Sequence, residues 1–539
     1  MQRYVKYLLH AFVFGKINSN NEMGKFMKKL LLTLLILLIG IKSYAATVWI
    51  NDTRAQFQTN SLVILGVNIR TFNAKDLNKN GIIEEKKGEE RGTFLNAIDR
   101  LDELAMQGVN TIHLLPITPV GKLKAVGTAG SLYALNSYNE INPQLRSKNS
   151  KLSVKEQAIR FIDEAHRRKI RVIVDLPAYA SYDYYLKHNS LFEVKDSQAA
   201  IIPKDFTDVR LLNAGRQGRI NLDLLDKYKS FVDMMLEIGA DGIVANDAYT
   251  KPADFWSELI KYTKVKSPQF LFVAQATDKE TPLDINNKKL PFTPYNELLE
   301  AGFDGYFAGY SRFSEWSTAN ELYEHVKFNQ KLFSKYDLIK SDIGSFATHD
   351  TVSPILTNGT PYSIMVAWLN ATLPVNAYFM DGFQSGDDYM YPWENKRAKK
   401  SFTDDNFYFV QRGKVDIFNF SRKPGASNGD VLQNFILANK FKFMMNQIMP
   451  NAKFVPLATN SSNVFSYART TKNNSVIVIG NMDFSNMQNV KVSVPNLNDK
   501  VSVVPVKISD IPVVQRNRIN TILAPGEVQV LLVKDFSIK

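Results

Sequence analysis

The chain has 539 residues, of which 45% are apolar, and its formal net charge is +13. This apolar content excludes a largely disordered protein, and the length is sufficient for a large core and more than one domain. Because no dense stripe of Lys and Arg alternates with aromatic residues, we expect no nucleic-acid partner. The absence of cysteine excludes disulfide bonds and the lipid-modified cysteine of a bacterial lipoprotein.

Residues 1–45 are predicted to be a leader and secretory signal peptide. Two lysines precede a twelve-residue apolar run, Leu30 to Ile41, and small residues follow it up to Ala45. This order is typical of a cleavable signal, and the run is short for a membrane span. We expect export to the periplasm or the exterior, with no stable membrane anchor after cleavage near Ala45. The start codon stays open between Met1, Met23 and Met27.

Strand-like and helical segments alternate along residues 46–450. The predicted strands are 62–72, 111–117, 171–177, 241–246, 269–276, 304–310, 343–348 and 375–381. The helices that follow them in turn are 93–107, 153–168, 226–238, 253–265, 295–301, 318–335, 362–373 and 429–449. Successive strand–helix pairs of this kind predict an α/β fold, a (β/α)8 barrel. The connection 178–225 is longer than an ordinary one.

Residues 451–539 show a different pattern. Short alternating apolar runs are interrupted by Asn, Ser, Gly and Pro, which predicts an antiparallel β-sandwich. We expect this second domain to cover one end of the barrel rather than to bind a ligand independently.

Three predicted barrel strands end in polar residues, Asn246, Gln275 and Asp350, where a parallel barrel presents functional side chains. The segments around them, GIVAN, AQ and THD, resemble the α-amylase family of glycoside hydrolases, whose corresponding strands end in G-F-R-x-D, in Glu and in N-H-D. Residues 69–117, 130–145 and 171–181 resemble further motifs of that family in the expected order. The resemblance covers residues 62–450 and implies a small subdomain within 178–225.

The resemblance implies three catalytic positions, of which two are substituted. The nucleophile position is Asn246, the acid/base position is Gln275, and the third carboxylate is Asp350. Retaining hydrolysis needs one carboxylate to attack the sugar and one carboxylic acid to protonate the leaving oxygen, about 5 Å apart. A neutral amide does neither, and the loss of acid–base assistance alone removes about 10²–10⁴ in rate. We therefore expect hydrolysis to be lost or strongly impaired.

Other family positions divide into lost and retained ones. Val244 stands where the family has Arg, Tyr179 and Ala180 replace its Asn-His pair, and Ser137 replaces an Asp. The family residues that contact the sugar are retained, which implies substrate binding by Tyr133, Asp175, His349 and Asp350. The predicted partner is a saccharide, an α-glucan or a related one.

Two alternatives stay open. In the first, the protein is an active α-glucan hydrolase or transglycosylase that uses a relocated carboxylate; the candidates are Asp247, Asp278, Asp381, Asp387 and Asp388. Asp247 would serve only if its strand has ended or bulged, because adjacent strand residues face opposite sides. In the second alternative, the barrel has lost sugar binding and is a scaffold for protein interactions.

A loop after the first strand places oxygen-bearing side chains at alternate positions, with a glycine among them. It resembles the family's calcium loop D-x-N-x-D-G-x-G-D. The resemblance implies structural Ca²⁺ held by Asp76, Asn78, Asn80, the Ile82 carbonyl and Glu84, consistent with the preference of Ca²⁺ for oxygen ligands. The alternative is a turn without a metal.

Aromatic residues gather in two predicted rim loops, as Tyr182, Tyr184, Tyr185, Tyr389, Tyr391 and Trp393. They either stack on sugar rings or cap the barrel with a polar tip in water.

Overall fold

The computed structural model describes residues 49–538 except 76, 79–82, 84, 126–130, 196–197, 200–207, 278, 283, 286–287, 352, 388–427, 499–500 and 510–511. Residues 51–539 form one compact unit. Several predictions lie outside the described residues: the signal peptide, the calcium ligands Asp76, Asn80, Ile82 and Glu84, and the rim residues Asp278, Asp388, Tyr389, Tyr391 and Trp393. No helix in the described part is long and apolar enough to span a membrane.

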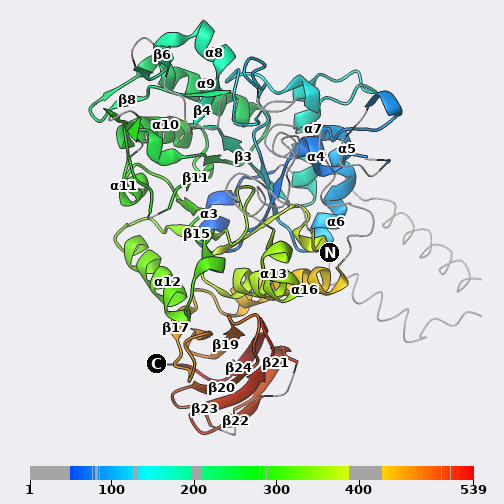
Figure 1. The fold of residues 1–539 in the computed structure, drawn as a ribbon, viewed down its shortest axis with the longest axis vertical. Coiled ribbons are helices and arrows are strands. Elements are labelled where there is room, and N and C mark those ends of the chain that lie inside the picture. The colour runs from blue at the N-terminus through cyan, green and yellow to red at the C-terminus, as the bar shows by residue number, and fades with distance from the viewer. Residues whose placement is uncertain are drawn as a thin grey trace, which may run out of the picture. The chain divides into compact units, whose positions relative to one another are not determined.

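The predicted barrel is confirmed. Its strands are β1 (Val63–Val67), β2 (Thr111–Leu114), β3 (Arg171–Leu176), β10 (Gly242–Ala245), β11 (Leu271–Gln275), β14 (Gly305–Phe307), β15 (Ser341–Gly344) and β16 (Asn376–Met380). They pair in parallel in chain order, and β1 closes the barrel against β16. The helices lie outside the strands (Figure 1). All carboxyl ends of the strands therefore meet at one rim, where sites form in this fold.

The helices connect the strands and cover the barrel. They include α5 (Phe94–Ala97), α6 (Leu101–Met106), α7 (Val154–Arg167), α9 (Leu222–Glu237), α10 (Ala253–Lys266), α11 (Tyr295–Glu300), α12 (Ala319–Phe333), α13 (Pro354–Thr372) and α16 (Gly429–Ile448). Capping boxes begin α5 at Thr93, α7 at Ser153 and α12 at Thr318, so unpaired amides of the first turn are satisfied there.

Two predicted boundaries differ most from the observed ones. The strand predicted at 62–72 ends at Val67, and Ile69–Phe72 form the short helix α4, because the Asn68 side chain accepts a hydrogen bond from the Arg70 amide and caps that turn. The helix predicted at 362–373 begins at Pro354, with a kink at Gly359, whose φ of +69° lies in the left-handed region.

The barrel interior and its outer layer are separate apolar clusters. The interior cluster includes Ile64, Ile173, Val244, Val273 and Phe307, which alternate with outward-facing residues of the same strands. The larger outer cluster lies between strands and helices. Val244 is thus a packing residue of the barrel lumen.

The connection after β3 forms a small inserted region. It contains β4 (Tyr179–Ser181) paired with β7 (Val209–Leu211), helix α8 (Tyr182–Lys187), and the hairpins β5 (Val194–Lys195) with β6 (Gln198–Ala199) and β8 (Gly215–Arg216) with β9 (Arg219–Ile220). The Ser181 side chain caps α8 by accepting from the Tyr184 amide. This region extends the barrel rim beyond β3 and β10.

Two antiparallel sheets follow the barrel, as predicted. One contains β17 (Lys453–Pro456), β18 (Val464–Thr470), β19 (Asn474–Asn481), β24 (Val528–Lys534) and β21 (Val503–Lys507) in that order; the other contains β20 (Gln488–Ser493), β23 (Arg518–Leu523) and β22 (Val513–Gln515). Both sheets are orange to red in Figure 1, and strands β18, β19 and β24 of the first sheet contact α12 and α13. One face of the first sheet belongs to the same apolar cluster as the barrel helices.

Candidate functional site

The two amides predicted at the catalytic positions lie side by side at the carboxyl-end rim. Asn246 directly follows the last residue of β10, and Gln275 is the last residue of β11. The Asn246 Nδ2 donates to Gln275 Oε1 at 2.8 Å, and the Gln275 Nε2 donates to Asp350 Oδ2 at 3.0 Å. Asn246 is 8% exposed, Gln275 is 7% exposed, and the Asp350 side chain is 35% exposed. The three predicted positions therefore form one hydrogen-bonded chain.

The retained sugar-binding positions form a second group beside this chain. The Tyr133 hydroxyl donates to Asp175 Oδ2 at 2.6 Å and lies 2.7 Å from His349 Nε2. A hydroxyl has one proton, so it accepts from His349 while it donates to Asp175. The Tyr133 and His349 rings stack with centroids 5.6 Å apart, and His349 Nε2 lies 3.4 Å from Asp350 Oδ2. Every predicted catalytic and sugar-binding residue is thus brought together.

Within the part of the chain that the structure describes, the carboxylates Asp175 and Asp350 have no Lys or Arg partner. Val244 occupies the family's arginine position within the barrel lumen. His113 Nε2 lies 3.7 Å from Asp175 Oδ2, but burial and then His349 lower the pKa of His113 to about 3, so it is neutral. Among the described residues, no Lys or Arg pairs with Asp175 or Asp350.

The charge of Asp175 is correspondingly disfavoured. Burial raises the pKa of Asp175 well above its usual range; the Tyr133 hydrogen bond opposes this shift, and Asp350 and Asp247 add to it. Asp175 is fully buried, and its Oδ1 makes no hydrogen bond within the described residues. A protonated Asp175 is therefore favoured, which leaves Asp350 as the more exposed acceptor of the site.

Asp247 meets the condition set for a relocated carboxylate, because β10 ends two residues before it. Its φ of +39° lies in the left-handed region, and a short helical turn, Ala248–Thr250, follows it. The side chain accepts a hydrogen bond from the Tyr179 hydroxyl at 2.8 Å. Burial raises the pKa of Asp247 to about 7; the Tyr179 hydrogen bond opposes the shift, and Asp350 increases it. Asp247 is thus near the site, but held by Tyr179.

Of the other candidate carboxylates that the structure describes, Asp381 has a structural role. Asp381 Oδ2 lies 3.0 Å from Arg100 Nη1, and Asp381 Oδ1 accepts from Gln384. The backbone carbonyl of Asp387 accepts from the Ser353 hydroxyl, and the residue is buried. Neither is hydrogen-bonded to the Asn246–Gln275–Asp350 chain.

The aromatic rim residues that the structure describes are mostly engaged. Tyr184 is buried, and Tyr185 packs on the inserted region's Phe192 at 5.4 Å. Lys124 and Arg210 lie over the Tyr182 ring, 4.1 and 4.5 Å from its centroid. These contacts favour capping over sugar stacking for this loop.

Sequence reasoning missed two residues at the site, Phe307 and Tyr179. The Phe307 ring is nearly parallel to that of His349, with centroids 6.3 Å apart. As the last residue of β14, it could have been found by the strand-end criterion applied to Asn246. The sequence marks Tyr179 only as a substituted family position, and its hydrogen bond to Asp247 depends on the turn after β10.

The predicted calcium loop lies mostly outside the described residues. Of the five predicted calcium ligands, only Asn78 lies among the described residues, and its backbone amide donates to Glu89 Oε1 at 3.1 Å. The calcium loop therefore stays a prediction. The described part contains no other cluster of three acidic, His or Cys residues suited to a metal ion.

Fold and site together define a (β/α)8 barrel with Asn246, Gln275 and Asp350 at its carboxyl-end rim, and known proteins share this fold. No protein-family profile matches the chain. It is 24% identical over 424 residues to the α-1,4-glucan:maltose-1-phosphate maltosyltransferase of Picrophilus torridus, covering 76% of the chain and 61% of that protein. For the enzyme of the same name from Myxococcus xanthus, the identity is 24% over 256 residues, covering 45% of the chain and 36% of that protein.

Solved structures show the same fold. An α-amylase from Lactobacillus plantarum matches with a TM-score of 0.65 and 16% identity, covering 88% of the chain and 100% of the amylase. A maltogenic α-amylase from Thermotoga neapolitana matches with a TM-score of 0.64 and 17% identity, covering 89% of the chain and 100% of that amylase. The predicted resemblance to the α-amylase family is thus confirmed, and the relatives are glucan-processing enzymes of carbohydrate metabolism. The chain spans about three fifths of the Picrophilus relative's length.

Proposed function

We propose that the protein binds an α-glucan or a related saccharide in the barrel mouth without hydrolysing it by the retaining mechanism. The observation that carries this proposal is the hydrogen-bonded chain of Asn246, Gln275 and Asp350. Retaining hydrolysis requires a nucleophilic carboxylate and a protonated carboxyl at the positions of the two amides. An amide supplies neither a competent nucleophile nor a transferable acidic proton, so covalent catalysis is absent.

The same residues are suited to bind sugar hydroxyls. After their bonds to each other and to Asp350, the two amides each keep one N–H donor, and Asn246 keeps its carbonyl acceptor. Asp350 is exposed enough to accept from a hydroxyl group, and the stacked rings of Tyr133 and His349 provide a flat wall for a pyranose face. The α-glucan substrates named for the relatives support the choice of ligand.

Titration calorimetry of the full chain with maltoheptaose tests the proposal. We expect heat pulses that saturate and return to baseline, which indicates binding without turnover. Asp350→Ala should weaken binding at least tenfold, and Tyr182→Phe, which alters an already engaged rim tyrosine, is the matched control. Sustained heat flow after each injection would overturn the claim that the amides abolish hydrolysis.

The relocated-carboxylate alternative rests on Asp247, whose pKa of about 7 suits a group that gains and loses protons near neutrality. If the wild type shows sustained heat flow and Asp247→Asn abolishes it, that alternative replaces the proposal. If no glucan produces heat at any concentration, the barrel is a scaffold and both saccharide proposals fail.

We also propose that the chain is exported and that the loop from Asp76 to Glu84 binds Ca²⁺ for structural stability. An oxygen-rich loop beside β1 would tether the rim, so chelation should lower the melting temperature and added Ca²⁺ should restore it. An unchanged melting temperature in EDTA would contradict a structural role for Ca²⁺.

A further inference from the structure

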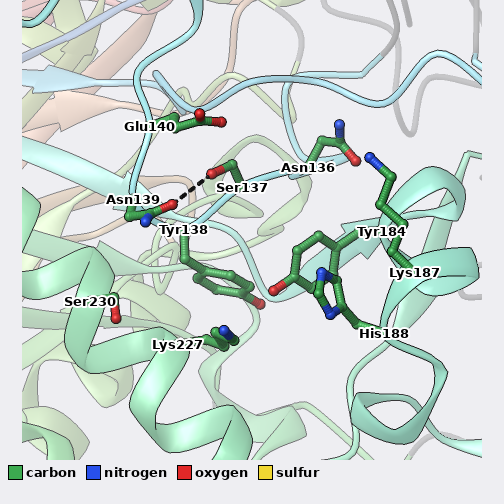
Figure 2. Close-up of a pocket in the computed structure, with 10 residues that line it drawn as sticks. All are labelled: Asn136, Ser137, Tyr138, Asn139, Glu140, Tyr184, Lys187, His188, Lys227 and Ser230. Atoms are coloured by element: carbon green, nitrogen blue, oxygen red, sulfur yellow. Dashed lines mark hydrogen bonds between the residues drawn. The ribbon is translucent and has the colours of Figure 1, made fainter.

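A second pocket lies on the outer rim, between the loop after β2, the inserted helix α8 and helix α9. Its volume is about 220 Å³, which is enough for a monosaccharide-sized ligand. The residues that line it are Asn136, Ser137, Tyr138, Asn139, Glu140, Tyr184, Lys187, His188, Lys227 and Ser230 (Figure 2). None of them is a residue of the amide chain or of the Tyr133 group.

The pocket gathers nitrogen-bearing side chains on one side. Lys187 and His188 come from the end of α8, and Lys227 comes from α9. No hydrogen bond or ion pair engages Lys187 or Lys227 within the described part of the chain. Burial, Lys227 and Lys187 lower the pKa of His188, in that order. The three groups thus favour an added negative charge.

The other lining residues offer neutral and acceptor groups. Asn136, Ser137, Asn139 and Glu140 belong to the loop after β2, and Ser137 donates to Asn139 at 3.0 Å. The Ser181 hydroxyl holds Asn136 by donating to its Oδ1 at 2.9 Å. In Figure 2, the Lys187 side chain extends towards the neighbouring Asn136. A bare oxyanion would leave these groups unused and would meet Glu140, whereas a sugar's hydroxyls would use them.

Two buried tyrosines also line the pocket. Tyr138 is 2% exposed, and its buried hydroxyl lies next to that of Tyr228. Its ring packs against Tyr184, with centroids 5.6 Å apart, and the His188 ring lies 4.4 Å from that of Tyr184. These packed rings give the pocket an apolar surface.

We propose that this pocket is a second binding site, separate from the barrel mouth, for a sugar that carries a phosphate or carboxylate group. The oxyanion lies among Lys187, His188 and Lys227, and the sugar hydroxyls lie against Asn136, Asn139 and Glu140. The tyrosine rings provide the apolar surface for the C–H face of the ring. Because the site uses neither Asn246 nor Gln275, it does not depend on the proposed function of the barrel.

Calorimetric titration of the full chain tests this site with four probes: glucose 6-phosphate, glucuronate, glucose and inorganic phosphate. We expect one of the two charged sugars to bind at least tenfold more tightly than glucose and than phosphate, and which of them binds identifies the oxyanion. Equal affinity for glucose would overturn the anion assignment, equal affinity for phosphate would overturn the sugar assignment, and absence of binding would overturn the site.

Variants locate the binding. Lys187→Met and Lys227→Met should each weaken the charged sugar about tenfold, while Lys229→Met, also on α9 but paired with Asp226, should leave it unchanged. Asp350→Ala should not affect it; loss of binding in that variant would place the ligand in the barrel mouth and overturn the proposal. The imidazole NMR resonance of His188 can be assigned by its loss in His188→Gln. Its pKa should be higher with the ligand bound, because a nearby anion favours the imidazolium. An unchanged titration would contradict contact with the oxyanion.

Discussion

At the scale of single residues, the substitutions at Val244, Asn246 and Gln275 together remove both positive and negative charge from the barrel mouth. The arginine position is Val244, and among the described residues no Lys or Arg forms an ion pair with Asp175 or Asp350. Asp175 and Asp247 already have raised pKa values, mainly through burial. Two more carboxylates at Asn246 and Gln275 would raise the cost of charge further. The amides avoid that cost, and their N–H groups donate the two hydrogen bonds that ionised carboxylates could not donate.

Tyr133 connects the retained residues, so its hydroxyl should be important for stability. Tyr133→Phe removes the hydrogen bond that reaches the buried Asp175, whose Oδ1 has no partner in the described part. We expect a loss of about 1–3 kcal/mol in the free energy of unfolding, because a buried acceptor is left unsatisfied. Urea denaturation measures it, with Tyr182→Phe as a control that should change by less than about 0.5 kcal/mol. An equal effect of both variants would contradict the role of the Asp175 contact.

Asp247 should make stability depend on pH. Its pKa is about 7 in the folded protein and near 3.9 in the unfolded chain. Between these values the folded state holds a proton that the unfolded state has lost, so the free energy of unfolding falls as pH rises through this window. From pH 5 to 8 the wild type should lose about 2 kcal/mol more than Asp247→Asn, after allowance for partial exposure. Urea denaturation at each pH measures this difference. If the free energy of unfolding falls equally with pH in both proteins, Asp247 is not the group responsible.

The site was largely predictable because strand ends are determined by local sequence. An apolar run that stops at Asn246 or Gln275 places that residue at the rim once the barrel closes. The left-handed turn at Asp247 and its bond to Tyr179 were not predictable, since they depend on how two distant segments meet. The second pocket was missed for the same reason, because three separate elements line it.

At the scale of elements, an ion pair fixes the end of β16 to the first helical layer. Arg100 Nη1 lies 3.0 Å from Asp381 Oδ2 and donates to the Phe72 carbonyl at 2.7 Å, and both charged side chains are buried. The β16 strand was predicted from its apolar run, but this partner 281 residues away was not. We therefore interpret Asp381 as a structural carboxylate rather than as a relocated catalytic one.

Asp381→Ala should separate these two roles. It leaves Arg100 buried without its acidic partner from β16, which costs about 3–5 kcal/mol in the free energy of unfolding. Maltoheptaose affinity, measured by calorimetry on the folded variant, should change less than twofold. A variant of normal stability with lost saccharide binding or turnover would contradict the structural role.

At the scale of the whole molecule, the barrel and the first C-terminal sheet share one core. The Tyr323 hydroxyl of α12 donates to the Ser466 carbonyl of β18 at 2.9 Å, and the Thr372 and Tyr467 hydroxyls lie 2.7 Å apart. The change in sequence pattern after residue 450 predicted a separate sandwich. It could not predict that inward residues of β18, β19 and β24 would join the barrel's outer apolar cluster.

The shared core predicts that barrel and sheet unfold together. Arg469 of β18 is 7% exposed and donates to the carbonyls of Thr372, at the end of α13, and of Ala452. Arg469→Met leaves these buried carbonyls without that donor, so we expect a loss of about 1–3 kcal/mol. Scanning calorimetry should show one transition in both proteins, shifted to lower temperature in the variant. Arg518→Met, at an exposed position in the outer sheet, should not shift it. Two separate transitions in the wild type would show that the sheet is an independent domain.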